Sequence, residues 1–119
     1  MERPKCVFLD IDGTIVRHSG SLSGQIMQTP TLLDGTIEAM SEWDKMGYTI
    51  ILTTGRKEGL RDVTKKQLLE LGIIYDQLIM GIGGGIRVLI NDKKINTESQ
   101  TAIAINLERN EGIKNLKNL

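Results

Sequence analysis

Short apolar runs alternate along this chain with segments of helical spacing, and that alternation restricts the fold more than any other feature. Residues 6–9 and 48–53 are apolar or β-branched at nearly every position, which is typical of strands covered on both faces in a parallel sheet. Between them, residues 36–46 carry large apolar side chains at the spacing of one helix face. A strand, a helix and a second strand in this order predict an α/β fold with right-handed crossover connections.

The rest of the chain continues the pattern. Residues 60–71 have the spacing of a second helix, and Gly72 provides its end. Helices on both sides of the sheet would give a three-layer, Rossmann-like architecture. Residues 15–33 follow neither period and contain glycines and a serine cluster, so they predict a β-hairpin flap after the first strand. Three further apolar runs bring the mostly parallel sheet to about five strands: residues 77–80, 87–90 and 102–106.

Length and composition fit a single domain over residues 1–119. Fifteen basic residues balance fifteen acidic ones, so no overall field steers the protein toward nucleic acid, and we expect no nucleic-acid partner. No apolar run approaches the roughly 20 residues that a membrane span needs. Residues 1–5 do not resemble the start of a signal peptide. The single cysteine, Cys6, agrees with a reducing compartment, and we expect a cytoplasmic protein with Cys6 buried in the first strand.

The segment of residues 107–117 alternates between acidic, basic and polar side chains, which predicts a surface location. Its two apolar residues, Ile113 and Leu116, would then be available to pack on the sheet or on a neighbouring subunit.

Two carboxylates follow the first apolar run, in the pentapeptide Asp10-Ile11-Asp12-Gly13-Thr14. On an extended segment, residues i and i+2 project to the same side, and the carboxyl ends of strands are where α/β sheets bind ligands. Because two nearby carboxylates repel each other, both stay ionised at neutral pH only if a cation or hydrogen-bond donors compensate their charge. Mg²⁺ is the natural cation, since it prefers such oxygen ligands. The alternative is a simple exit from strand to turn, since Asp-Gly is common in turns.

The pentapeptide resembles the first motif of the haloacid dehalogenase (HAD) superfamily, and the likeness extends over nearly the whole chain. The resemblance implies a HAD-type hydrolase in which Asp10 is the nucleophile and forms an aspartyl-phosphate intermediate. It also implies that Asp12 is the general acid and then the general base, and that its backbone carbonyl helps to hold the metal.

Residues 50–56 resemble the second HAD motif, a strand that ends in a hydroxyl residue. The resemblance assigns phosphate binding to Thr54, with Gly55 allowing the backbone to approach closely. Thr53 is the competing choice. Arg56 either clamps an anionic group of the substrate or faces solvent.

Residues 88–92 resemble the fourth motif, in which an acidic pair completes the metal site. Asp92 would then join Asp10 and Asp12 as a ligand of Mg²⁺. Where the family often has a second acid, this chain has Asn91. Its side chain would either supply a neutral oxygen to the metal or contact a residue that binds the metal.

The third motif normally supplies a lysine, or less often an arginine, and this chain has no lysine at the expected place. Residues 81–87 occupy the expected place and contain four glycines and Arg87 but no lysine. Arg87 is one candidate for the missing cation, and Lys65 and Lys66 in the preceding helix are the others. The glycines either cradle a phosphate or form a tight, flexible connection.

The spacing of the motifs leaves no room for a cap domain, so the resemblance implies a small capless member. An open site suits a large substrate or a homo-oligomer in which a neighbouring subunit closes the cleft. The expected function is a Mg²⁺-dependent phosphatase acting on a phosphorylated sugar or another small metabolite of a bacterial carbohydrate pathway. One alternative is a binding or regulatory module that retains the metal site with little turnover. Another is a nucleic-acid 3′-phosphatase, which fits the open site but not the neutral charge.

Overall fold

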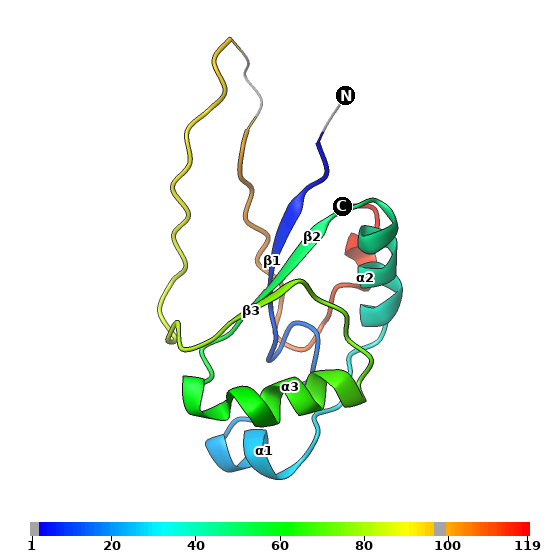
Figure 1. The fold of residues 1–119 in the computed structure, drawn as a ribbon, viewed down its shortest axis with the longest axis vertical. Helices are drawn as coiled ribbons and strands as arrows, with labels where there is room; N and C mark the ends of the chain where they lie inside the picture. The colour runs from blue at the N-terminus through cyan, green and yellow to red at the C-terminus, as the bar shows by residue number, and fades with distance from the viewer. Residues whose placement is uncertain (1–2, 97–99) are drawn as a thin grey trace.

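The computed structural model describes residues 3–96 and 100–119 and has an α/β fold (Figure 1). Apart from the short helix α1 and the 3-10 turn η1, its strands and helices follow the order that the sequence predicts over the first 80 residues. The elements, with the 3-10 turns η1 and η2, are β1 (Cys6–Asp10), α1 (Leu22–Met27), α2 (Thr36–Lys45), β2 (Thr49–Thr53), η1 (Glu58–Leu60), α3 (Arg61–Glu70), β3 (Gln77–Ile79) and η2 (Lys114–Leu116).

The sheet contains three parallel strands in the order β1-β2-β3. Helix α2 provides the crossover from β1 to β2, and α3 provides the crossover from β2 to β3. Asp10 is the register partner of Thr53, so β1 and β2 end side by side. This shared edge is where the sequence predicts the site, because parallel strands bring their carboxyl ends together.

The core lies between the sheet and α2. Trp43 on α2 is 1% exposed, and its indole N–H donates to the carbonyl of Leu116 at 3.0 Å. Ile113 is fully buried within the same core, so the segment that we expected at the surface does place this side chain on the sheet. The other buried members include Val7, Leu9, Ile11, Ile15, Val16, Ala39, Met40, Ile50, Leu52, Leu68 and Ile73.

One face of β1 is covered, and the other is open in the described part of the chain. Val7 and Leu9 point into the core, whereas Phe8 is 56% exposed on the opposite side. Cys6 is exposed too, so the expectation of a buried thiol is wrong, because the strand position that it occupies faces away from the core. The prediction of helices on both faces therefore does not hold at β1.

The expected β-hairpin flap is not confirmed. The chain between β1 and α2 forms only single-residue bridges, which join Val16 to Asp12 and to Leu32. A short helix, α1, begins after Ser21, whose hydroxyl accepts the amide N–H of Gly24 at 3.0 Å. An N-cap serine of this kind favours a helical turn over a strand, which is a local signal that the periodicity of the segment did not reveal.

Residues 82–96 and 100–106, here called the arm, contain no strand in the structure. Ile86 is 94% exposed and Ile90 is 87% exposed, so the apolar runs at 87–90 and 102–106 find no partner strand within the described residues. Figure 1 shows the arm (yellow to orange) running from near α3 to the opposite end of the molecule and back. The radius of gyration, 15.0 Å, exceeds the roughly 13.5 Å of a compact chain of this length. The described sheet has three strands where about five were expected.

No helix in the described ranges is long and apolar enough to cross a membrane.

Replacing Ile113 by alanine should lower the free energy of unfolding by about 2–5 kcal/mol, because it leaves a cavity beneath the sheet. The matched variant Ile95→Ala, at an arm position that is 88% exposed, should change it by no more than about 0.5 kcal/mol. Urea unfolding followed by Trp43 fluorescence measures both values. A cost for Ile95→Ala as large as that for Ile113→Ala would mean that the arm packs on the body in solution.

Candidate functional site

Asp10 and Asp12 are held by a tight turn at the carboxyl end of β1. The carbonyl of Ile11 accepts hydrogen bonds from the three successive amides of residues 14–16, at 3.0–3.2 Å. Gly13 has a φ of 87°, a left-handed conformation that other residues adopt at a cost, and its amide donates to the carbonyl of Val16 at 2.7 Å. The turn therefore fixes the two carboxylates relative to the sheet.

The carboxylate of Asp10 is the more open of the two. The hydroxyl of Thr14 donates to its Oδ2 at 3.1 Å. Burial among neighbouring groups raises the pKa of Asp10, while the Thr14 hydroxyl and the backbone at Ile11 lower it. The charge of Asp12 raises this pKa further, and the charge of Arg87 lowers it. Asp10 thus sits in a partly desolvated setting where a cation would favour its charged form.

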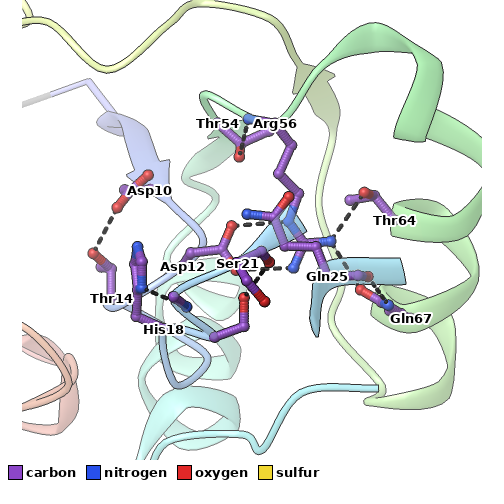
Figure 2. A network of polar contacts seen from close by, with 12 residues as sticks. Asp10, Asp12, Thr14, His18, Ser21, Gln25, Thr54, Arg56, Thr64 and Gln67 are labelled. Carbon is purple, nitrogen blue, oxygen red and sulfur yellow. Dashed lines mark hydrogen bonds and ion pairs between the residues drawn. The ribbon is translucent and has the colours of Figure 1, made fainter. Parts of the chain in front are cut away.

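Asp12 forms a bidentate ion pair with Arg56. Nε and Nη2 of Arg56 each donate to one carboxylate oxygen at 2.8 Å, and the two side chains are only 2% and 12% exposed. Nη1 of Arg56 donates to the hydroxyl of Thr64 at 3.0 Å and to Oε1 of Gln67 at 2.8 Å (Figure 2). The sequence left two alternatives for Arg56, a clamp on the substrate or a side chain that faces solvent. In the structure its guanidinium does neither, because it is buried and bonded to Asp12, Thr64 and Gln67. Its role in this structure is to orient Asp12.

Thr54 and Gly55 follow directly on β2, whose last residue, Thr53, is the register partner of Asp10. Thr54 is 1% exposed, and its Oγ1 accepts the amide N–H of Arg56 at 3.1 Å, which leaves its own hydroxyl proton to be donated. A Cβ on Gly55 would lie 2.7 Å from the carbonyl oxygen of Gly83, so only glycine fits where the base of the arm passes. Thr53, the alternative phosphate ligand, is partly exposed beside Asp10.

Asp92 is not brought to the two carboxylates. It is exposed on the arm, where its backbone carbonyl accepts from the hydroxyl of Thr101, and the neighbouring Asn91 side chain donates to the carbonyl of Thr101 at 3.5 Å. Among the described residues, no three His, Cys, Asp or Glu side chains are grouped closely enough to hold a metal ion. The predicted set of Asp10, Asp12 and Asp92 is not assembled, because residues 87–90 do not pair with the sheet.

The three candidate cations differ in their placement. Lys65 and Lys66 are exposed on α3. Arg87 folds back along the base of the arm, where Nη2 donates to the carbonyl of Gly83 at 2.8 Å and Nη1 donates to the carbonyl of Gly85. Of the three, Arg87 is the one whose charge acts on Asp10.

A hollow opens above the carboxylates, and two of its lining residues were missed by sequence analysis. Its lining contains Asp10, Asp12, Gly13, Thr14, Leu107 and Arg109. Leu107 and Arg109 belong to the segment that the charge pattern assigned to the surface. The available signal was the turn composition of Asn110-Glu111-Gly112, shortly after the last apolar run, which would return the chain to the same sheet edge.

Comparisons with known proteins give matches to solved structures alone, since no family model matches the chain and no curated protein matches it. A chain in a structure of the Pnkp1/Rnl/Hen1 RNA repair complex is 29% identical, with a TM-score of 0.57 over 65% of this chain and 25% of that one. A chain in another structure of the Pnkp1/Rnl/Hen1 complex is 30% identical, with a TM-score of 0.54 over 71% and 30%.

A D,D-heptose 1.7-bisphosphate phosphatase from B. bronchiseptica, complexed with magnesium and phosphate, is 21% identical, with a TM-score of 0.48 over 67% of this chain and 51% of that one. The chain thus spans between a quarter and about half of the proteins it matches. The two likenesses to chains of the Pnkp1/Rnl/Hen1 complexes show that the fold of this chain occurs in part of those chains.

Replacing Asp10 by asparagine should raise the melting temperature at pH 7, because the amide avoids the cost of burying a charge. Since the pKa of Asp10 is raised in the folded protein, this cost is fully present above the folded pKa and is lost as the pH falls through it toward about 4. Thermal unfolding between pH 4 and 8 should therefore show a gain that shrinks with acidity. A difference between Asp10→Asn and the wild type that stays constant over this pH range would contradict the assignment.

Replacing Arg56 by methionine should lower the free energy of unfolding by about 3–5 kcal/mol, because it leaves the buried charge of Asp12 without a partner. The matched control is Arg61→Met, which removes a surface pair with Glu58 at 2.8 Å and a hydrogen bond to the carbonyl of Leu78 at 3.2 Å, and which should cost no more than about 1–2 kcal/mol. Chemical denaturation of both variants compares the two. Equal losses would show that the Asp12 pair is not buried in solution.

Proposed function

We propose that this chain is a HAD-type phosphatase that hydrolyses phosphomonoesters through an aspartyl-phosphate intermediate. The observation that carries the proposal is the unequal state of the two carboxylates at the end of β1. Asp10 lies open to the hollow, whereas Asp12 is oriented by two hydrogen bonds from Arg56. Such a pair suits one nucleophile and one proton carrier.

In the proposed reaction, a carboxylate oxygen of Asp10 attacks phosphorus and the bond to the leaving oxygen breaks. Asp12 donates a proton to that oxygen, which leaves as an alcohol. Asp12 then takes a proton from water, and the resulting hydroxide attacks the aspartyl-phosphate and frees Asp10 and inorganic phosphate. The ion pair with Arg56 is compatible with both roles, because each carboxylate oxygen has a second lone pair that the guanidinium does not use.

The donor set at the hollow fits Mg²⁺ in the mode in which one or two protein oxygens and the substrate phosphate share the ion. The carboxylate of Asp10 and the backbone carbonyl of Asp12 would hold it. When bound, Mg²⁺ supplies positive charge that offsets the phosphoryl oxygens. Asp92 lies on the arm and would complete the set only after the arm had brought it to the sheet edge.

Arg87 and Thr54 are our choices for the remaining contacts to the phosphoryl group. Arg87 supports the charge of Asp10, which is the electrostatic part of the missing lysine's role. Thr54 retains a hydroxyl proton to donate. Gly55, which has no Cβ, lets the backbone of Gly83 pass close to it.

For the substrate, we propose a phosphorylated sugar or similar small metabolite, because the hollow is small and has apolar Leu107 at its side. A second candidate is the phosphorylated end of a nucleic acid. The specific observation in its favour is the likeness, at 29–30% identity, to chains of the Pnkp1/Rnl/Hen1 complexes, one of which is described as an RNA repair complex. The neutral overall charge weighs against it.

Release of p-nitrophenol from p-nitrophenyl phosphate tests the proposal. We expect release that requires Mg²⁺, stops with EDTA and is lost in Asp10→Asn. Thr54→Val should lower kcat/KM by about 10²–10³-fold, as expected for a lost hydrogen bond to the transition state. Thr53→Val is its matched control and should have a smaller effect.

A panel of phosphosugars and a 3′-phosphorylated RNA oligonucleotide then separates the two substrate classes. Binding of Mg²⁺ without turnover of any panel member would instead favour a regulatory module that retains the metal site.

Homo-oligomerisation remains a prediction from the open site. Gel filtration of the full chain measures it directly.

A further inference from the structure

Arg109 is a cation at the hollow that the proposed reaction does not yet use. Its side chain lies over the turn that follows the two carboxylates, since Cγ of Arg109 is 3.2 Å from the point that a Cβ on Gly13 would occupy. It lines the hollow together with Asp10 and Asp12. Gly13 therefore has a second role beyond its φ of 87°: it makes room for the stem of Arg109.

The guanidinium of Arg109 has no protein partner within residues 3–96 and 100–119, although two carboxylates line the same hollow. Both carboxylates are engaged elsewhere: Asp12 with Arg56, and Asp10 with Thr14. An arginine presents five N–H donors in a planar fork that matches a phosphate or carboxylate group. A free fork beside the nucleophile is thus a vacant binding group for an anion.

The backbone next to Arg109 is hydrogen-bonded to the turn after β1 that holds Asp10 and Asp12, here called the nucleophile turn. The amide of Asn110 donates to the carbonyl of Gly13 at 2.8 Å, and Oδ1 of Asn110 accepts the amide N–H of His18 at 2.9 Å. Three residues later, Ile113 is fully buried in the core. These contacts hold the Cα of Arg109 in place, so that only the side chain loses freedom when an anion binds.

The local charge balance gives Arg109 an effect on affinity. Arg56 and Arg87 offset the charges that Asp10 and Asp12 carry when both are ionised. Whether Asp12 is protonated or not, and with or without Mg²⁺, Arg109 adds one positive charge to this group of side chains, and that charge favours an incoming phosphate.

We propose that Arg109 binds the phosphate group of the substrate, as a second cation in addition to Arg87 of the arm. This inference rests on the proposed function for the identity of the anion. It goes beyond that function by assigning a phosphate ligand outside the four sequence motifs, on a segment that follows the last predicted strand.

Titration calorimetry of the full-length protein with inorganic phosphate, in the presence of Mg²⁺, tests the proposal without requiring turnover. Arg109→Ala should weaken phosphate binding by about 10- to 100-fold, as expected for the loss of a charge-assisted bidentate contact. Arg109→Lys should recover part of the loss, because it restores the charge but not the fork. Arg17→Ala is the matched control, because Arg17 is exposed and does not line the hollow, and it should bind phosphate as the wild type does.

The outcomes separate this inference from the proposed function. Because the guanidinium makes no hydrogen bond within residues 3–96 and 100–119, Arg109→Ala should keep the wild-type melting temperature, which excludes misfolding as the cause of weak binding. Weakened phosphate binding in Arg109→Ala, with no turnover in the wild type, would support the anion site and contradict the proposed phosphatase activity. Turnover in the wild type, with unchanged KM and phosphate affinity in Arg109→Ala, would overturn the role of Arg109 alone. No phosphate binding by the wild type would overturn it as well.

Discussion

The ion pair between Arg56 and Asp12 is the interaction on which the described structure most depends. It joins the turn after β1 to the turn after β2, and the same guanidinium reaches α3 through Thr64 and Gln67. Gln67 in turn donates to the carbonyls of Gln25 and Gln28, which fastens the segment of α1 to α3. A buried charge is tolerated only when it is paired and fully hydrogen-bonded. One arginine therefore orders the site and the layer of helices beneath it together.

The first two thirds of the fold could be predicted from the sequence because its signals are local. Apolar runs and helical spacing place β1, β2, β3, α2 and α3 to within a few residues. The parallel arrangement then brings Asp12 and Arg56 together, 44 residues apart in the chain and 2.8 Å apart in space. The partner of Arg56 was not foreseen, because composition does not tell whether an arginine at a sheet edge meets a substrate or a carboxylate of its own chain.

The arm and the C-terminal segment mark where local signals fail. Residues 87–90 have the hydropathy of a strand, yet strand formation needs a partner edge, and hydropathy does not specify one. Asp92 is displaced from the carboxylates for the same reason, so one unpaired segment removes both a strand and a metal ligand from the described site. Arg109 shows the reverse case. Its surroundings look solvated in sequence, and its position comes from the hydrogen bond of Asn110 with His18, 92 residues away, and from the burial of Ile113 in the core.

Residues 107–119 contribute both to the core and to the site, and this affects how the site forms during synthesis. Ile113 completes the core, the carbonyls of Leu116 and Leu119 accept hydrogen bonds from Trp43 and Tyr48, and Asn110 closes the nucleophile turn. The strands β1, β2 and β3 can leave the ribosome and pair before any of these contacts exist. The hollow above Asp10 is finished only once residues 107–119 have emerged, so a nascent chain would carry its nucleophile in an incomplete pocket until translation had passed this segment.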